Sequence, residues 1–191
     1  INYTGIELSS AFVKFARKKL AKFRDLAQVL EGDMRNVDLD QQFQFIFIGF
    51  NSIFYLLNNE DVSSFFSCVY SHLLDDGLFL IDAFVPHPIV LYRAKQKYYV
   101  MEFDWPSGKH CIVNETNHYD SDSQINHIHW YFNTSGENEM DEYRFDMHMI
   151  FPDTMDRLLT EAGFVIKEKY GDYDKISLDT ESKLQIYVCG K

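Results

Sequence analysis

Polar side chains follow three apolar segments in the first third of the sequence. Glu7 closes the segment NYTGIE, Asp33 follows AQVLEG, and Asn51 follows FQFIFIGF. In sheets built from alternating strands and helices, ligands bind beyond the carboxyl ends of the strands, so these side chains are expected at one edge. A carboxylate at that edge can accept hydrogen bonds from two adjacent ribose hydroxyls. Glu7 suits that role, and Asp33 suits an exocyclic amine such as that of adenine.

Two apolar residues stand beside these acids. Leu8 follows Glu7 and Met34 follows Asp33, so both are candidates to cover a base. Each acid has a simpler explanation when taken singly, because Glu7 also fits a surface position and Asp33 also fits a turn. Their order and spacing carry more weight than either residue alone.

The first half of the chain alternates apolar runs with amphipathic helical patterns, which predicts βα units and a mostly parallel sheet. Strands are expected near 3–7, 27–33, 43–50 and 78–84, and the run at 43–50 is apolar enough for a central strand covered on both faces. Ser9 or Ser10 and Asn58 or Asn59 are the expected helix caps. The predicted buried stripes are Phe12, Ala16, Leu20 and Phe23 in the first helix, and Val62, Phe65, Phe66, Val69 and Leu73 in the second.

The pattern changes to a period of two residues from about position 96. Four alternating segments separated by turn compositions predict an antiparallel meander over 96–151, inserted into the α/β fold as a lid or a dimer surface. Residues 1–191 are expected to form one domain, since no linker or repeat interrupts them. The predicted meander segments are 97–105, 109–119, 126–134 and 141–151, followed by a helix ending at Gly163 and strands at 165–173 and 183–191.

Charge and cysteine content narrow the class of protein. The formal net charge is −11, which argues against a nucleic-acid partner because phosphate backbones are bound by Lys and Arg. Cys68, Cys111 and Cys189 are widely spaced and form no CxxC pair, so buried thiols in a reducing compartment are expected. No apolar run is long enough to span a membrane and no basic-then-apolar signal pattern opens the chain. A cytoplasmic protein is therefore expected.

The order of these segments resembles a known family. GIELSSAFVKFARKKL, VLEGDMRNVDL, FQFIFIGFNSIFYL, HLLDDGLFLIDAF and LLTEAGF are similar to the class I S-adenosylmethionine-dependent methyltransferases, in particular the small-molecule branch with an antiparallel insertion before the last helix. The resemblance implies a Rossmann-like α/β fold, S-adenosylmethionine as the cofactor and a small-molecule substrate. It also implies that Glu7 binds the ribose, that Leu8, Asp33 and Met34 bind the adenine, and that Phe50, Asn51 and Ser52 line the methionine portion.

The sequence departs from the family pattern at its amino-terminal end. It contains no GxGxG motif, and it opens within the strand that ends at Glu7. In the family, a further strand lies between the strands predicted at 3–7 and 43–49, and unpaired buried backbone groups cost about 1–3 kcal/mol each. About 40 or more upstream residues are therefore expected. A rearranged sheet and a strand from a second chain are the alternatives.

The sequence gives weaker indications of the residues that bind the substrate or catalyse the reaction. His87, in DAFVPHPIVLY, is a candidate general base because the pKa of histidine lies near neutrality, although a loop histidine between two prolines is the simpler interpretation. Tyr55 is a candidate pocket wall, or else a core residue. His127 and His129 share one face of a strand, but alternation guarantees no third ligand, so no metal site is predicted.

Two other functions remain open at this stage. One is a methyltransferase-like binding or regulatory protein without the glycine-rich loop. The other is a nicotinamide-dependent oxidoreductase, because Glu7 would serve the ribose of a dinucleotide equally well. The methyl acceptor, the choice between nitrogen and oxygen, and the oligomeric state, including a homodimer, are not determined by the sequence.

Overall fold

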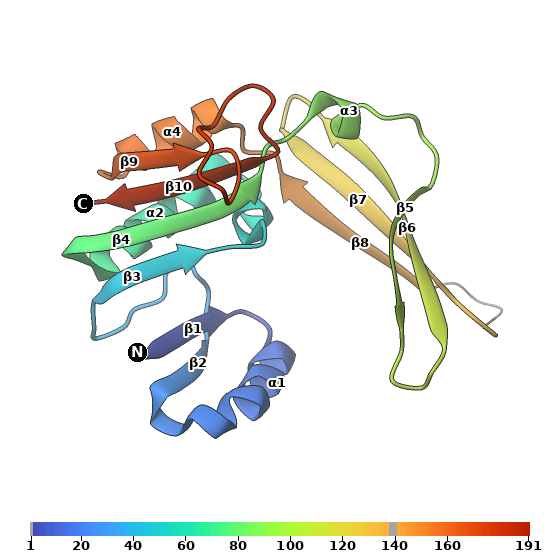
Figure 1. Cartoon of the computed structure of the whole chain (residues 1–191), viewed down its shortest axis with the longest axis horizontal. Coiled ribbons are helices and arrows are strands. Elements are labelled where there is room, and N and C mark those ends of the chain that lie inside the picture. The colour runs from blue at the N-terminus through green and yellow to red at the C-terminus, as the bar shows by residue number, and fades with distance from the viewer. Residues whose placement is uncertain (1, 138–140) are drawn as a thin grey trace.

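The computed structural model describes residues 2–137 and 141–191. Its strands form three sheets, with the orders β1-β2, β3-β4-β10-β9 and β5-β6-β7-β8. Figure 1 shows the first two sheets on one side of the molecule and the third on the other. We call the first two sheets and their helices the frame, and the third sheet the meander.

The frame begins with a small βα unit. Ser9 caps the first helix by accepting a hydrogen bond from the Phe12 backbone N–H at 3.4 Å, as predicted. Strands β1 and β2 then pair in parallel, in agreement with the βα pattern. The unit contains β1 (Tyr3–Glu7), α1 (Ser10–Leu20), the 3₁₀ helix η1 (Ala21–Leu26) and β2 (Ala27–Glu31).

The predicted buried stripe of α1 is wrong. Val13 is the buried residue of this helix, whereas Phe12 is 65% exposed and Phe23 lies beyond the helix end, 45% exposed. The helix packs on β2, and Arg17 Nε donates to the Val29 carbonyl at 2.8 Å. A two-stranded sheet covers too little area to bury a wide helical stripe.

The larger sheet of the frame has its core on one side. Figure 1 shows α2 and α4 together behind this sheet. Asn58 caps α2 by accepting from the Asp61 N–H at 2.8 Å, and the predicted stripe of this helix is buried. Its elements are β3 (Phe43–Ile48), η2 (Ser52–Tyr55), α2 (Asn59–His72), β4 (Leu73–Phe84), α4 (Pro152–Glu161), β9 (Val165–Tyr170) and β10 (Leu184–Gly190).

The start of β4 and the end of α4 differ from the predicted boundaries. β4 begins at Leu73, directly after α2, because residues 73–77 are already extended, so the DDG segment does not separate helix from strand. α4 ends at Glu161, and Gly163 follows it with φ 95°, as predicted for a helix stop. A β-carbon at Gly163 would lie 3.2 Å from the Tyr70 ring, so glycine is favoured there for space as well.

Strand β3 is not the covered central strand that its apolar sequence predicts. It pairs with β4 alone among the described strands, and Phe45 and Phe47 are 52% and 54% exposed. Ile46 and Ile48 face the helices, whereas the two phenylalanines face the other side. Apolar residues on both faces predict burial on both sides, but here only one side is covered by helices.

The β1-β2 sheet and the β3 sheet remain separate. Among the described residues, β1 pairs with β2 and β3 pairs with β4, so the facing edges of β1 and β3 are not joined. Figure 1 shows the two strands running in the same direction. Within residues 2–137 and 141–191, the strands therefore do not form one rearranged sheet that joins β1 to β3.

The meander agrees with the alternating pattern of the sequence. Its strands pair antiparallel in sequence order, and the short helix α3 (Pro88–Leu91) precedes them. Gln185 of β10 joins β4 to the segment that follows β8, because its Nε2 donates to the carbonyls of Phe84 and Ile150 at 2.9 and 2.8 Å. The strands are β5 (Tyr98–Asp104), β6 (His110–Asp120), β7 (Ile125–Thr134) and β8 (Asp141–His148).

The cysteines are unpaired in this fold. Cys111 and Cys189 are buried and Cys68 is half-buried, as free thiols. Burial raises the pKa of Cys189 to about 12, so this thiol stays protonated. In the part of the chain that the structure describes, no helix is both long enough and apolar enough to cross a membrane.

Candidate functional site

Glu7 and Asp33 lie at the same edge of the small unit. The register of β1 and β2 places Glu7 opposite Glu31, and the Gly32 N–H donates to the Glu7 carbonyl at 3.1 Å. Asp33 follows two residues after the end of β2. The fold therefore brings the two predicted carboxylates to the carboxyl ends of adjacent parallel strands, where ligands of such sheets bind.

The carboxylate of Glu7 is half-buried and held by its own loop. Its Oε1 accepts a hydrogen bond from the Ser9 N–H at 2.8 Å, at the point where α1 begins. Among the described residues, its second oxygen accepts no hydrogen bond. One fixed oxygen and one available oxygen suit a group that receives hydroxyl donors from a ligand.

Asp33 is held by an arginine that the sequence reasoning did not single out. Arg35 donates to both carboxylate oxygens, with Nη2 at 2.5 Å from Oδ2, and its Nη1 lies 2.8 Å from Asp61 Oδ1. These hydrogen bonds from Arg35 lower the pKa of Asp33, so its carboxylate is ionised at neutral pH. Arg35 also ties the small unit to the first turn of α2, where Asp61 lies.

Leu8 and Met34, the two apolar residues predicted to pack on the adenine, have different surroundings. Leu8 is 71% exposed directly after β1, whereas Met34 is partly buried against the main core. Leu8 is therefore free to contact a ligand. Met34 acts at least in part as a packing residue.

Phe50 and Asn51 follow β3 in an unusual backbone conformation. Both have positive φ, 53° for Phe50 and 62° for Asn51, which is costly for residues other than glycine. Asn51 Oδ1 accepts from the Phe84 N–H at 2.8 Å and so joins the ends of β3 and β4. Phe50 is 94% exposed. Strain of this kind is concentrated at functional sites, and it is held here by the neighbouring strand.

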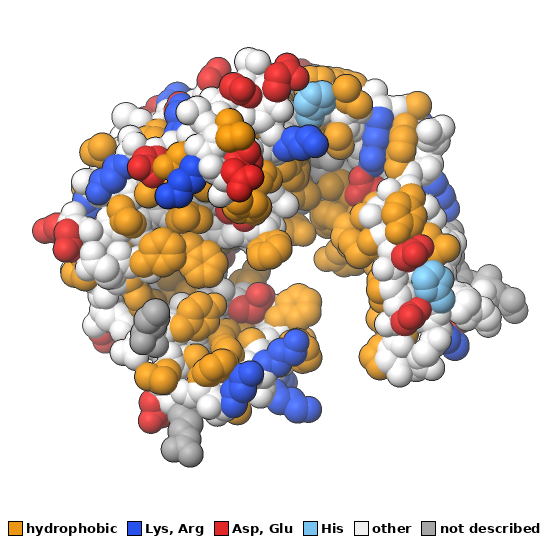
Figure 2. All heavy atoms as spheres, viewed as in Figure 1, with side chains coloured by type: hydrophobic (Ala, Val, Ile, Leu, Met, Phe, Trp, Pro, Cys, Tyr) orange, Lys and Arg blue, Asp and Glu red, His pale blue; other side chains and the backbone are white. Residues whose placement is uncertain are grey.

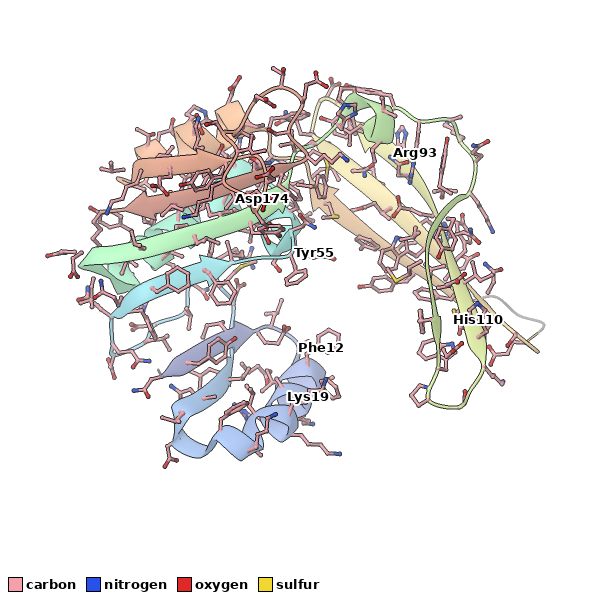
Figure 3. The ribbon with its side chains drawn as sticks, in the orientation of Figure 1. Phe12, Lys19, Tyr55, Arg93, His110 and Asp174 are labelled. Carbon is pink, nitrogen blue, oxygen red and sulfur yellow. The ribbon has the colours of Figure 1, made fainter. Side chains whose placement is uncertain are left out.

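Ser52 and Tyr55 begin and end η2. Ile53 and Phe54 between them are fully buried and fix the element on the core. Ser52 N–H donates to the Gly49 carbonyl at 3.2 Å. Tyr55 is 54% exposed, and Figure 3 shows it where the frame meets the meander. The exposed ring excludes the core role that was the alternative for Tyr55.

Figure 2 shows the molecule hollowed between the small unit and the meander, with hydrophobic side chains on both walls. We call this hollow the opening. The Tyr55 ring lies 6.2 Å from the Phe145 ring of β8, across the top of the opening. Burial raises the pKa of Tyr55, and the nearby hydroxyl of Tyr143 adds to the effect, so the Tyr55 hydroxyl is neutral at physiological pH.

His87 is exposed and caps α3. Its Nδ1 accepts a hydrogen bond from the Ile89 N–H at 3.2 Å. His87 therefore has a structural role, because it caps the first turn of α3. A catalytic role for His87 stays a prediction.

The histidines of the meander pair with acids on the side of the sheet opposite Phe145. His127 Nδ1 lies 2.7 Å from Asp146 and His129 Nε2 lies 2.9 Å from Glu142. His148 instead is buried and contacts the Leu56 carbonyl. No three metal-ligating side chains converge within residues 2–137 and 141–191.

One shallow hollow lies away from these residues. It has a volume of about 460 Å³, and none of the predicted site residues lines it. Its walls come from α1, η1 and β2, on the side of the small unit away from the carboxyl ends of the strands. Its lining residues are Arg17, Leu20, Ala21, Asp25, Ala27, Gln28, Val29 and Leu30.

Comparison with known proteins supports the architecture. Residues 1–77 match a family described as a methyltransferase domain. A methyltransferase from Clostridium acetobutylicum ATCC 824, described as S-adenosylmethionine-dependent, superposes on 100% of this chain and 75% of its own, with a TM-score of 0.81 and 14% identity. The chain has a class I methyltransferase fold. The Rossmann-like fold class predicted from the sequence is thereby confirmed, and the predicted resemblance to S-adenosylmethionine-dependent methyltransferases is confirmed at the level of the fold.

Other solved methyltransferases have the same fold. The CcbJ methyltransferase from Streptomyces caelestis has a TM-score of 0.80 and 18% identity over 98% of this chain and 73% of its own. The sugar N-methyltransferase KedS8 from Streptoalloteichus sp ATCC 53650 has a TM-score of 0.73 and 19% identity over 98% of this chain and 71% of its own. None of the curated proteins compared with the sequence matches it. The TM-scores establish the methyltransferase fold. Because the identities are low, the substrate has to be argued from the site.

The sequence reasoning missed Arg35, Tyr143 and Phe145 as site residues. A signal for Arg35 was present, because DMR places it two residues after Asp33, within reach of that carboxylate. Tyr143 and Phe145 gave no such signal. They lie about 90 residues from Tyr55 in sequence, and only the packing of the meander brings them together.

Proposed function

We propose that the protein is an S-adenosylmethionine-dependent methyltransferase that acts on a small molecule. The observation that carries this proposal is the pair of carboxylates, Glu7 and Asp33, at the carboxyl ends of two paired parallel strands. Within a methyltransferase fold, this edge is the natural place for a nucleoside. The likeness to S-adenosylmethionine-dependent methyltransferases over the whole chain supports the same cofactor.

The residues present fit this cofactor. Glu7 has a carboxylate oxygen available for the ribose hydroxyls. Asp33 is ionised, and it would accept from the amino group of adenine in exchange for one of its hydrogen bonds from Arg35. Leu8 is exposed beside Glu7 and suits one face of the base. Phe50, Asn51 and Ser52 are proposed to line the methionine portion, because they end the neighbouring strand β3.

Catalysis by these residues consists mainly of positioning. S-adenosylmethionine supplies a methyl group on a positively charged sulfur. When bound, it would supply this methyl group to the acceptor's lone pair by in-line displacement of the sulfur, and the acceptor's proton would pass to a base or to water. Because this is an in-line displacement, holding the acceptor atom against the methyl carbon provides most of the rate. η2 serves this purpose, since its buried centre fixes Ser52 and Tyr55 in relative position.

The acceptor group is proposed to be an amine. Among the solved structures with this fold are a sugar N-methyltransferase and the glycopeptide N-methyltransferase MtfA. A neutral amine needs no strong base, whereas a hydroxyl does. His87 is proposed as a base only if the acceptor is a hydroxyl, because it already serves as a helix cap.

The experiment is a binding measurement on the full-length protein. S-adenosylhomocysteine at about 100 times its dissociation constant should stabilise the protein by about 2.7 kcal/mol in thermal unfolding, whereas NAD should not. Glu7→Gln should weaken binding about 10- to 100-fold, because a charged acceptor of the ribose is lost. Glu31→Gln is the matched control, since Glu31 is the exposed register partner of Glu7 on β2.

Two results would contradict the proposal. Stabilisation by NAD in place of S-adenosylhomocysteine would favour the oxidoreductase. Equal effects of the two glutamine substitutions would remove Glu7 from the ribose site.

A further inference from the structure

One side of the meander faces the frame across the opening. Tyr55 of η2 contacts Phe145 of β8, and Phe145 lies opposite Ile128 of β7 in the strand register. Trp130 and Tyr143 are opposed two residues further along the same two strands. Since side chains alternate along a strand, all of these residues point to one side of the sheet, which we call the inner side.

The inner side presents a continuous group of aromatic rings. The Phe145 ring lies 5.2 Å from Trp130, edge to face, and 5.6 Å from Tyr143. Tyr143 is 59% exposed and Tyr55 is 54% exposed, so both rings have free surface next to the half-buried rings of Phe145 and Trp130. Aromatic faces carry partial negative charge and attract cations within about 6 Å of the ring centre.

The charges of the inner side have one sign. By the same register, its charged residues within the described parts of β5–β8 are Glu115 and Asp141, and none is Lys or Arg. Glu115 accepts from Trp130 Nε1 at 2.7 Å and is paired with Arg93, which also covers the Tyr98 ring at 4.3 Å. The one arginine that packs on this side is therefore already matched by a carboxylate. Within the described strands, an anionic ligand would therefore find no lysine or arginine of the sheet itself on this side, in a protein whose net charge is −11.

The inner side borders the proposed cofactor edge. Tyr55 belongs to the same short element as Ser52, and the two fully buried residues between them hold the element in place. A methyl acceptor must lie within about 3–3.5 Å of the methyl carbon, so the acceptor has to bind next to this element. The aromatic rings of the inner side meet that condition through Tyr55.

We propose that Tyr55, Tyr143 and Trp130 bind the acceptor, and that the acceptor is an amine that is positively charged in solution. This inference rests on the proposed function, because it assigns the second substrate of the same reaction. The rings attract the ammonium group, and the neutral Tyr55 hydroxyl accepts a hydrogen bond from it. One proton must then leave the nitrogen for water before its lone pair can form the new bond to carbon.

The test uses a matched pair of probes on the full-length protein saturated with S-adenosylhomocysteine. Choline carries a permanent positive charge, and 3,3-dimethylbutanol is its uncharged carbon analogue. We expect choline to bind about fivefold or more tightly, which is the range of a partly exposed cation–π contact. The shift of the Trp130 indole signal in an NMR titration reports binding, and the Trp105 indole serves as an internal reference.

Tyr143→Ala should lower the affinity for choline to near that of the alcohol, whereas Tyr143→Phe should keep most of it because the ring remains. Tyr99→Ala is the control, since Tyr99 is a comparably exposed tyrosine of the same sheet on the opposite side. Equal affinities for choline and the alcohol would overturn this inference. So would equal losses in Tyr143→Ala and Tyr99→Ala.

The proposed function is tested separately in the same samples. If S-adenosylhomocysteine binds and choline shows no preference, the acceptor inference fails and the methyltransferase proposal stands. If S-adenosylhomocysteine does not bind, the methyltransferase proposal fails whatever the probes show.

Discussion

Phe50 shows most clearly how a single residue carries a conflict between stability and function. Its φ of 53° is unfavourable for a bulky side chain, and 94% exposure means that packing gives little in return. The conformation is maintained by Asn51, whose side chain is bonded to the β4 backbone at Phe84. A strained, exposed aromatic residue at a proposed cofactor edge is expected to gain its contacts from the ligand.

Substitution at position 50 separates the ring from the strain. Both Phe50→Ala and Phe50→Gly remove the ring, but only glycine relieves the positive φ. The relief of about 1–2 kcal/mol exceeds the entropy cost of glycine, about 0.4–1 kcal/mol, so the glycine variant should be more stable by about 0.5–1 kcal/mol. Denaturant unfolding measures this difference.

Binding of S-adenosylhomocysteine to the same two variants tests the role of the ring. Both variants should bind several-fold more weakly than the natural protein and equally to each other. Unchanged binding in both would show that the Phe50 ring does not line the cofactor site.

At the scale of elements, Arg35 connects two parts of the frame. The β1-β2 sheet has two strands, and so small a sheet is marginally stable without packing against other elements. Arg35 joins the loop after β2 to α2 through Asp33 and Asp61. The exposed fraction of the three side chains is between 23% and 41%, so the contribution is larger than that of a typical surface ion pair and smaller than that of a buried one.

Removing this link should loosen the small unit selectively. In Arg35→Met, amides of β1 and β2 should exchange with deuterium about fivefold faster, which corresponds to about 1 kcal/mol, while amides of β4 and β10 stay unchanged. Arg157→Met is the control, because its ion pair with Glu161 lies within α4. Equal acceleration across the larger sheet would mean that Arg35 stabilises the whole frame.

At the scale of the whole molecule, a buried histidine joins the meander to the frame. His148, at the end of β8, is 2% exposed, and its Nδ1 lies 3.1 Å from the carbonyl of Leu56, 92 residues away. The carbonyl accepts, so Nδ1 must carry a proton. Burial lowers the pKa of His148 below its ordinary value of 6.5, and the hydrogen bond to Leu56 offsets this in part.

This arrangement predicts acid sensitivity of the contact between meander and frame. Between the lowered pKa and 6.5, the unfolded chain binds more protons than the folded one, so stability is complete above about pH 6.5 and falls as the pH drops. The slope from one such group is at most about 1.4 kcal/mol per pH unit. Denaturant unfolding from pH 5 to 8 should show a smaller slope in His148→Gln, whereas the exposed control His118→Gln should keep the natural slope.

The sequence by itself determined the elements and the types of residue at the proposed cofactor edge. Periodicity located the strands and helices, and the position of Glu7 and Asp33 after strands placed them at one edge, because both are local properties of the chain. The sequence predicted burial wrongly for Phe12 and for one face of β3, because burial depends on which neighbouring elements cover a face.

Only the tertiary structure decided which distant residues meet. The contacts of Tyr55 with Phe145, of Arg35 with Asp61 and of His148 with Leu56 join segments between 26 and 92 residues apart. Strand alternation gives each residue a side, but it does not say what that side faces. The register and packing of the sheets supply that information, because they arise from the burial of all the elements together.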